Sequence, residues 1–382
     1  MAIKFKNSSV ESRFNLSFLT SSLFLSVIAL LGIGLVQVYS TSYIFATESY
    51  GDGLYFIKRQ FLFTLIAGFV LVVSTQIPFT YFRKWGWLLW FIAFLLVAMT
   101  FVPGLGVRVG GAIRWLQLPF GIRFEPSELL KISFSFLFAS LVCRHQNFLS
   151  NIKWGWLFLL IVAPLVVLLK QPDFGSFAII MMVGVSLLFV FGLRLRWLAL
   201  AALTSLPALY FIVWHSPYRR ARVQTFLDPW SDPAQKGFQV IQSMLSVHSG
   251  GLTGQGLGQG QGKLFFLPEA HTDFTMAVLG EETGFLGILA ILVLYAFVIF
   301  RGFQIALNTK DIFKKTLSIG LIMTFALSVF INVGVVMGLL PTKGLTMPFL
   351  SYGGSSLVVV CFLFGILLNI EMSEQSHSGK TI

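Results

Sequence analysis

Charged residues are scarce in this chain, and so is cysteine. Charged residues make up 11% of its 382 residues, whereas a soluble domain carries about a quarter. The two cysteines, Cys143 and Cys361, lie inside apolar stretches and match no metal-ligand spacing, so a disulfide scaffold is excluded. Apolar residues make up 56% of the chain, which excludes disorder. With a mean hydropathy of +0.83, this composition predicts a polytopic membrane protein.

Long unbroken apolar runs favour membrane-spanning helices over the short alternating segments of a β-barrel. Windows of about 19 residues predict an all-α fold with ten transmembrane helices. The expected spans are 17–40, 60–77, 86–103, 127–144, 154–170, 174–192, 196–215, 274–299, 316–340 and 352–370. The first is too long for a signal peptide and is interpreted as a retained anchor.

Basic residues mark alternate short loops, which the positive-inside rule places in the cytoplasm. Examples are Arg83, Lys153, Arg194 and Arg301. We therefore expect a single transmembrane domain over 1–382 with both termini cytoplasmic. It has tails at 1–16 and 371–382 and a large extracytoplasmic loop at 216–273 between the seventh and eighth helices. We expect that loop to be a lid or vestibule, with its glycine-rich part flexible.

Three titratable groups precede the eighth expected span in the run Leu267 to Phe274, namely Glu269, His271 and Asp273. Thr272 or Asp273 could simply cap the helix N-terminus. Alternatively, the helix N-terminus keeps Asp273 ionised as a general base, with His271 orienting it. Spacing alone does not separate these interpretations.

A second group surrounds the start of the fourth span. Glu128 and Lys131 are three residues apart and share one helix face, so a plain ion pair is the simpler interpretation. A lysine one turn inside an apolar span, with Arg114 and Arg123 before it, could also hold an anionic headgroup such as pyrophosphate.

Three further features carry polar groups at or near the membrane. Glu281 and Glu282 lie inside the eighth span, where they either serve function or pair to lock helices together. Arg219, Arg220 and Arg222 precede a glycine-rich segment that is not a Walker A loop, since Leu264 follows Gly262 and Lys263. The segment 341–356, which includes Lys343, is too rich in proline and glycine for a continuous helix and must line a cavity or pack on protein.

Seven motifs in this order make the chain similar to the SEDS family (shape, elongation, division and sporulation), which includes FtsW and RodA. They are GAIRWL, EPSELLK, QPDFGS, FLDPW, GFQVIQS, LPEAHTDF and PTKGLTMPFLSYGGSS. Residues 268–274 and 341–344 resemble the division branch, FtsW, more than RodA. Glu125 stands where the family usually has glutamine.

The resemblance implies a ten-helix peptidoglycan glycosyltransferase that polymerises lipid II at the outer face of the cytoplasmic membrane, here during septal wall synthesis. It places the catalytic base on Asp273 and the cavity acid and base on Glu128 and Lys131. We expect Arg114 or the arginines at 219, 220 and 222 to hold pyrophosphate with Lys131, and Glu269, His271 and Lys343 to line the substrate site.

The resemblance also implies partners: lipid II and the growing glycan strand, a class B penicillin-binding transpeptidase, and other division proteins. Nucleic acid is not expected. No dedicated metal-ligand set is present, although Mg²⁺ or Mn²⁺ could bind at the pyrophosphate. A lipid II flippase and a non-enzymatic division scaffold are the alternative functions, because intramembrane acids and a broken helix also suit transport.

Overall fold

The computed structural model describes residues 16–109, 112–144, 154–215, 217–235, 237–342 and 344–377. Helices dominate these residues. The long ones are α1 (Ser22–Tyr50), α2 (Tyr55–Gln76), α3 (Phe79–Met99), α4 (Pro126–Arg144), α6 (Trp154–Lys170), α7 (Phe174–Val190), α8 (Leu195–Trp214), α11 (Thr275–Asn308), α12 (Ile312–Val336) and α13 (Gly354–His377). Each apolar run expected to form a span therefore falls on a helix, because a helix satisfies its backbone groups internally.

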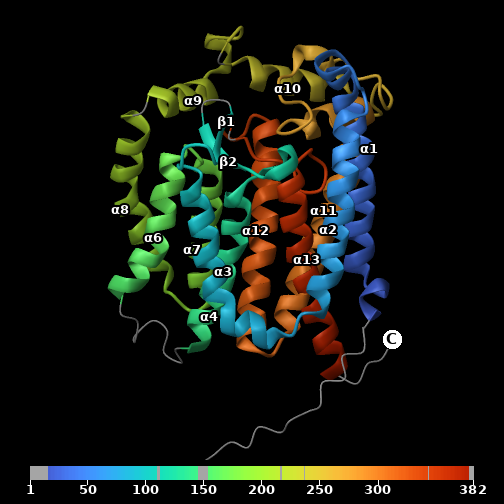
Figure 1. Cartoon of the computed structure of the whole chain (residues 1–382). Helices are drawn as coiled ribbons and strands as arrows, with labels where there is room; N and C mark the ends of the chain where they lie inside the picture. Colours follow the sequence, from blue (N-terminus) through green and yellow to red (C-terminus); the bar gives the residue numbers. More distant parts are fainter. Residues whose placement is uncertain are drawn as a thin grey trace, which may run out of the picture.

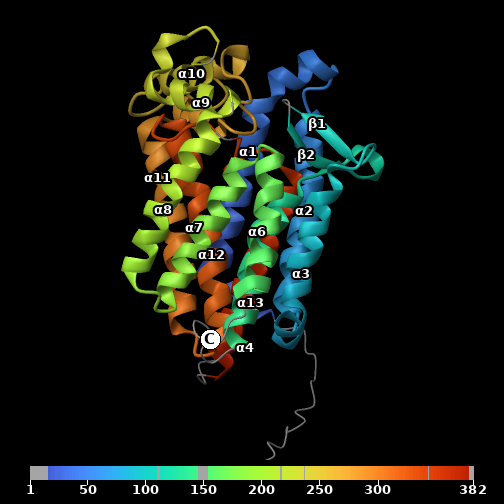
Figure 2. The same ribbon diagram turned by 90° about the vertical axis from the view of Figure 1, so that its left-hand side faces the viewer.

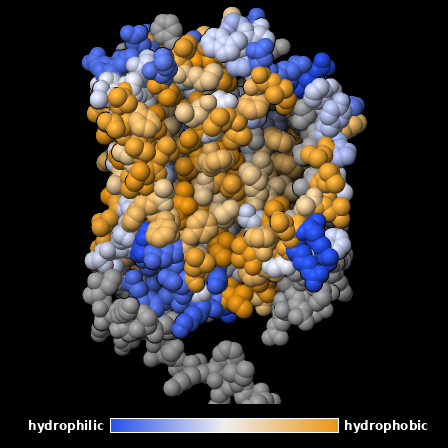
Figure 3. All heavy atoms as spheres, turned by 180° about the vertical axis from the view of Figure 1, so that it is seen from behind, coloured by the Kyte–Doolittle hydropathy of each residue, from blue (hydrophilic) through white to orange (hydrophobic). Residues whose placement is uncertain are grey.

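Seven of the described helices are long and apolar enough to cross a membrane, namely α1, α2, α3, α4, α11, α12 and α13. The apolar parts of α6 and α7 are shorter. On the face shown in Figure 3, apolar side chains form a broad band, with hydrophilic residues gathered toward both ends. The chain is thus an integral membrane protein, while the full count of ten spans remains a prediction.

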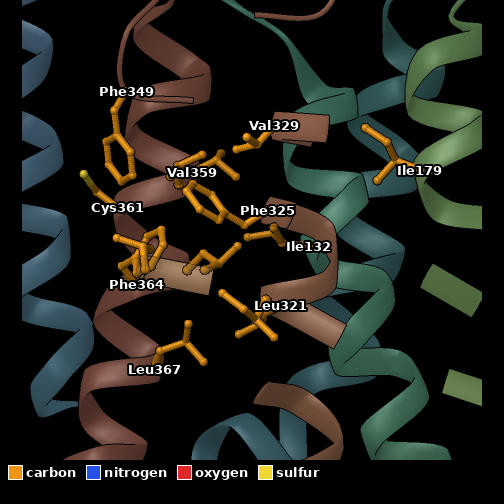
Figure 4. Close-up of a cluster of buried hydrophobic side chains, with 14 of the residues drawn as sticks. Ile132, Ile179, Leu321, Phe325, Val329, Phe349, Val359, Cys361, Phe364 and Leu367 are labelled. Atoms are coloured by element: carbon orange, nitrogen blue, oxygen red, sulfur yellow. The ribbon is translucent and has the colours of Figure 1, made fainter. Parts of the chain in front are cut away.

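The helices form one bundle with α12 and α13 in its interior and α8 and α1 at opposite edges (Figure 1). Most of the apolar window of α4, α12 and α13 is buried, whereas α2 and α3 bury only about a fifth of theirs. Figure 4 shows the centre of this core, where the ring of Phe325 on α12 meets that of Phe364 on α13 edge to face at 4.9 Å. Phe349, from the segment before α13, adds a third ring 5.5 Å from that of Phe364.

One end of the bundle carries most of the non-helical chain, and we call it the loop end. It holds a three-stranded antiparallel sheet of β1 (Gly106–Val109), β2 (Ala112–Gln117) and β3 (Arg123–Phe124). The expected all-α class is therefore wrong in this detail. The residues between α3 and α4 are too few and too polar for another helix pair, and they satisfy their backbone groups by strand pairing.

The segment 216–273 is also more regular than expected. It contains α9 (Pro217–Leu227), α10 (Phe238–Ser249) and a π-helical turn at Gly262–Phe266. Figure 2 shows α9 and α10 lying over one side of the loop end and the sheet over the other. We call the opposite end the tail end, because α1 begins and α13 ends there (Figure 1). There the hydroxyl of Ser21 donates to Glu371 at 2.6 Å, which ties the first helix to the last.

Candidate active site

Asp273 lies one residue before the N-cap of α11 and is held through its backbone. Its amide donates to the carbonyl of Glu269 at 3.1 Å, and its carbonyl accepts from Asn332 Nδ2 of α12 at 3.1 Å. The cap residue is Phe274, and no side chain caps the helix. The expectation that Thr272 or Asp273 caps α11 is therefore wrong. Among the described residues none donates a hydrogen bond to the Asp273 carboxylate.

The surroundings of Asp273 favour its protonated form more than water would. Burial raises the pKa of Asp273 to about 7, and the neighbouring Glu269 carboxylate acts in the same direction. The guanidinium groups of Arg114 and Arg222 lower this pKa, and they act less strongly than burial. A carboxyl group with a pKa near neutrality is suited to accept a proton from a substrate hydroxyl.

Arg114, on β2, links this carboxylate to the rest of the site. Its Nε donates to the carbonyl of Gln171 at 3.4 Å, and its Nη2 donates to that of Pro172. A Cβ added at Gly344 would lie 3.3 Å from Asp273 Oδ2 and 3.7 Å from Arg114 Nη1, so both groups face one point. Strand β2 and the turn before α7 thus hold a fixed cation near the presumed base.

Glu128 and Lys131 form a buried ion pair on the first turns of α4. Lys131 Nζ donates to Glu128 Oε1 at 2.8 Å, and the side chains are only 5% and 8% exposed. The hydroxyl of Ser356 on α13 lies within 3.5 Å of the second oxygen of Glu128. The ion pair expected from the spacing is confirmed. Its deep burial makes it more than a surface pair, because a buried charge requires a partner.

Two more acids lie beside this pair: Glu125, noted from the sequence as a departure from the family pattern, and Asp173, which was not singled out. Asp173 is the N-cap of α7, where one oxygen accepts from the amide of Ser176 at 3.1 Å, and the buried Oδ2 has no partner among the described residues. Burial, then the nearby Glu128 and Asp173, raises the pKa of Glu125 to about 8. Lys131 and Arg114 lower the same pKa, so Arg114 acts on both Glu125 and Asp273. From the sequence, Asp173 could have been identified as an acid in a three-residue gap between two apolar runs.

Asn332 is another residue that the sequence analysis missed. It lies in the apolar helix α12, is 1% exposed, and donates through Nδ2 to the carbonyls of Asp273 and Leu345. It thereby joins the residue before α11 to the segment before α13. A lone asparagine in a membrane-spanning helix was the available signal.

The remaining predicted site residues are less closely grouped. Arg222 donates to the carbonyl of Thr342 and influences Asp273, whereas Arg220 is exposed. The side chain of Arg219 and all of Lys343 lie outside the described residues. Glu269 is exposed, and its carbonyl accepts the amides of residues 272, 273 and 274.

His271 does not orient Asp273 in this structure. Its ring stacks on that of Phe45 at 5.3 Å and lies 4.9 Å from that of Phe56. Among the described residues, no hydrogen bond joins it to the Asp273 carboxylate. Burial lowers the pKa of His271, while Glu269 acts in the opposite direction. The His271 imidazole therefore packs as an aromatic ring.

Glu281 and Glu282 have structural partners. Glu281 accepts the amides of Gln261 and Gly262, and Glu282 pairs with Lys263 at 2.7 Å and accepts from the Ser40 hydroxyl at 2.6 Å. Of the two interpretations from the sequence, the locking one is confirmed. What they lock to α11 and α1 is the glycine-rich segment. The described residues contain no group of three or more His, Cys, Asp or Glu that could hold a metal ion.

The fold and the site together define an integral membrane protein with a buried charged site at one end of its helix bundle. A family model for FtsW, RodA and SpoVE, described as "Cell cycle protein", matches residues 21–376. The chain belongs to this family.

Curated relatives and solved structures agree with this assignment. The chain is 41% identical to the "Probable peptidoglycan glycosyltransferase FtsW" of Geobacter metallireducens, over 91% of this chain and 93% of that protein. It is 36% identical to the "Stage V sporulation protein E" of Bacillus subtilis, over 90% and 94%. A chain from a peptidoglycan synthase complex superposes with a TM-score of 0.75 at 26% identity, covering 92% of this chain and 97% of that one. Thermus thermophilus RodA, at 24% identity and a TM-score of 0.68, supports the fold alone.

Proposed function

We propose that this protein is a peptidoglycan glycosyltransferase that polymerises lipid II during cell division. Relatives named as FtsW glycosyltransferases, aligned over nine tenths of the chain, support the activity. The observation in the structure that carries the proposal is the Asp273 carboxylate. It accepts no hydrogen bond from a described residue, and it faces the same position beside Gly344 as the guanidinium group of Arg114.

In the proposed reaction, Asp273 takes the proton from the acceptor 4-hydroxyl as that oxygen forms its bond to the donor sugar. The bond between that sugar and pyrophosphate breaks, and the lipid pyrophosphate leaves. Its negative charge needs a fixed cation rather than a protein acid. Arg114 and Arg222 are placed to supply this charge, and Lys131 adds a cation that Glu128 positions.

The proposed topology follows from the arrangement of the bundle. We assign ten spans with both termini in the cytoplasm, so that the loop end faces outward, where lipid II carries its saccharide. The shared location of the start of α1 and the end of α13 supports an even number of spans (Figure 1). We also propose that the protein resides in the cytoplasmic membrane at the division septum.

Two further components belong to the proposal. One neighbour comes from a peptidoglycan synthase complex that coordinates polymerization and crosslinking, and we propose a penicillin-binding transpeptidase as a partner here, alongside other division proteins. Among the described residues no group of three candidate ligands marks a metal site. We propose that Mg²⁺ or Mn²⁺ binds only with pyrophosphate, which would supply most of its oxygen ligands.

The test uses the purified full chain with the proposed partner and fluorescent lipid II. Wild type should produce glycan ladders, and Asp273→Asn should lower polymerisation by about 10² to 10⁴ fold. Asp311→Asn is the matched control, because Asp311 caps α12 at the tail end and asparagine can cap equally well. Ladders from Asp273→Asn at the wild-type rate would refute the proposed base. Headgroup translocation without ladders would favour a flippase, and an Asp273→Asn chain that supports normal division would favour a scaffold.

A further inference from the structure

A chain of aromatic rings runs from the site to the surface at the loop end. His271, two residues before Asp273, contacts the ring of Phe56 at 4.9 Å. Phe56 meets Tyr55 edge to face at 5.2 Å. Tyr55 stacks on Tyr50 at 4.1 Å with an interplanar angle of 6°. The rings come from the end of α1, the start of α2 and the segment before α11, and so bridge three parts of the chain.

This row of rings is fastened to the segment that precedes α13. The amide of Tyr352 donates to the carbonyl of His271 at 2.9 Å, and its ring meets that of Phe56 edge to face at 4.9 Å. Residues 341–353 also include Gly344, which borders Asp273. The inner end of the row is thus continuous with the site.

The outer end of the row is open. Tyr50 is 52% exposed. The guanidinium of Arg59 lies 4.3 Å from the centre of the Tyr55 ring, and Tyr50 stacks on that ring at 4.1 Å. Two groups this close cannot share one face of a ring, so Arg59 and Tyr50 cover opposite faces of Tyr55. Tyr50 also meets Phe56 edge to face at 5.7 Å, and about half of its surface stays exposed.

This open ring lies beyond the apolar band. Helix α1 has 29 residues and is about 44 Å long at 1.5 Å per residue, whereas the hydrocarbon core is about 30 Å thick. The turn after Tyr50 carries Asp52, which pairs with Lys58 at 2.8 Å, and both side chains are well exposed. Charged neighbours of this kind place the turn in water or among headgroups.

An exposed aromatic face flanked by charged side chains suits a pyranose ring. The axial C–H bonds of a sugar carry partial positive charge and pack on the negative face of an aromatic ring, while its hydroxyls bond to nearby polar groups. We propose that Tyr50 and Tyr55 form a saccharide subsite that holds the growing glycan strand as it leaves Asp273. This inference rests on the proposed function and assigns the polymer, rather than a lipid headgroup, as the occupant.

The first experiment measures product length from fluorescent lipid II. Tyr50→Ala should shorten the glycan about two- to tenfold and leave the initial rate of lipid II consumption within about twofold, because the subsite acts after the first transfer. Tyr50→Phe should restore the length, since the ring face is what binds.

The matched control is Trp214→Ala. Trp214 and Tyr210 stack at 5.1 Å with an angle of 15°, are exposed, and lie at the loop end of α8 across the bundle from α1 (Figure 1). Unchanged product length in Trp214→Ala is expected. If Trp214→Ala and Tyr50→Ala shorten the glycan equally, the tyrosines are only an interfacial aromatic belt and the subsite is refuted. Wild-type length in Tyr50→Ala refutes it as well.

The second experiment needs no catalysis. Saturation-transfer NMR with the N-acetylglucosamine tetramer should show binding to wild type and to Asp273→Asn, and several-fold less to Tyr50→Ala. If wild type makes no polymer, the proposed function fails while this measurement still decides whether the rings bind saccharide. Equal signals from wild type and Tyr50→Ala would overturn the inference.

Discussion

The acid pair Glu281 and Glu282 lies within ten residues of Asp273, near the start of α11, but the surroundings of the pair and of Asp273 differ. Glu281 and Glu282 accept hydrogen bonds from two backbone amides, a lysine and a serine. Asp273 accepts none from a described residue, and burial raises its pKa to about 7. Both groups are partly or wholly withdrawn from water. Glu281 and Glu282 are bound to fixed partners within the chain, although the buried Oε2 of Glu282 accepts no hydrogen bond from a described residue.

The difference separates a structural acid from a reactive one. A buried carboxylate held by several fixed donors stabilises one arrangement of the chain. A carboxylate that receives no such donor costs stability, and it is retained where a ligand supplies one. Glu128 and Lys131 fall between these two cases. They pair with each other, but they lie next to Asp173, whose buried Oδ2 has no partner among the described residues.

The largest effect should come from breaking the structural lock. Lys263→Met leaves Glu282 buried without its cation, and we expect a loss of about 3 to 5 kcal/mol in stability. The free energy of unfolding can be followed by denaturation in mixed micelles. The double variant Lys263→Met/Glu282→Gln should recover most of this loss and retain polymerisation. A double variant that folds but is inactive would show that Lys263 and Glu282 take part in the reaction.

The Glu128 and Lys131 pair should respond differently to the same treatment. Lys131→Met/Glu128→Gln removes both charges, so folding should be largely restored relative to Lys131→Met. Polymerisation should remain about 10² to 10³ fold below wild type, as when one stabilising donor is lost from a reaction site. Rate measurements on folded, monodisperse protein decide this. Full activity in the double variant would show that this pair is structural too.

The pH dependence follows from the raised pKa of Asp273. As a general base it must be ionised, so activity should rise about tenfold between pH 6 and pH 8 for a pKa of about 7. Asp273→Asn should lack this limb in its residual activity.

The free energy of unfolding should fall as pH rises, whereas activity rises. The folded protein keeps a proton that the unfolded chain releases, because the pKa of Asp273 is raised from 3.8 to about 7. The folded state is therefore favoured at low pH, and this advantage is lost as pH rises between those values. The melting temperature of Asp273→Asn minus that of wild type should therefore increase from pH 5 to pH 8. A constant difference would show that Asp273 is already fully ionised.

The smallest effect should come from adding a methyl group beside the Asp273 carboxylate. Gly344 has a φ of +66°, and a Cβ there would lie 3.3 Å from Asp273 Oδ2. Gly344→Ala should cost about 1 to 2 kcal/mol of stability through its left-handed backbone and reduce activity several-fold. Gly192→Ala is the control, because its φ is +88° and no atom lies within 4 Å of the added Cβ. Equal activity losses in the two variants would mean that backbone strain alone is responsible.

Much of this arrangement could be predicted from the sequence. The apolar runs located each long helix, and the spacing of Glu128 and Lys131 predicted their ion pair. The placement of an acid within an apolar helix correctly offered locking as one role for Glu281 and Glu282. The family motifs, read in order, identified the SEDS family, which the family model confirmed over residues 21–376.

Other features depended on neighbours distant in the chain. His271 is two residues from Asp273, yet its ring packs on Phe45 and Phe56 of α1 and α2. Arg114 reaches the carbonyls of residues 171 and 172, and Asn332 joins residues 273 and 345. No local pattern in the chain encodes these contacts.

Hydropathy and backbone hydrogen bonding act locally along the chain, so the amino-acid sequence was enough to predict long helices in a membrane. It also determined which acids and bases are available at the ends of those helices. Which of these acids receive hydrogen bonds from described residues depends on how distant segments pack together. Whether a carboxylate is ionised depends on the charges and donors within a few ångströms, and packing brings those groups from distant positions in the chain.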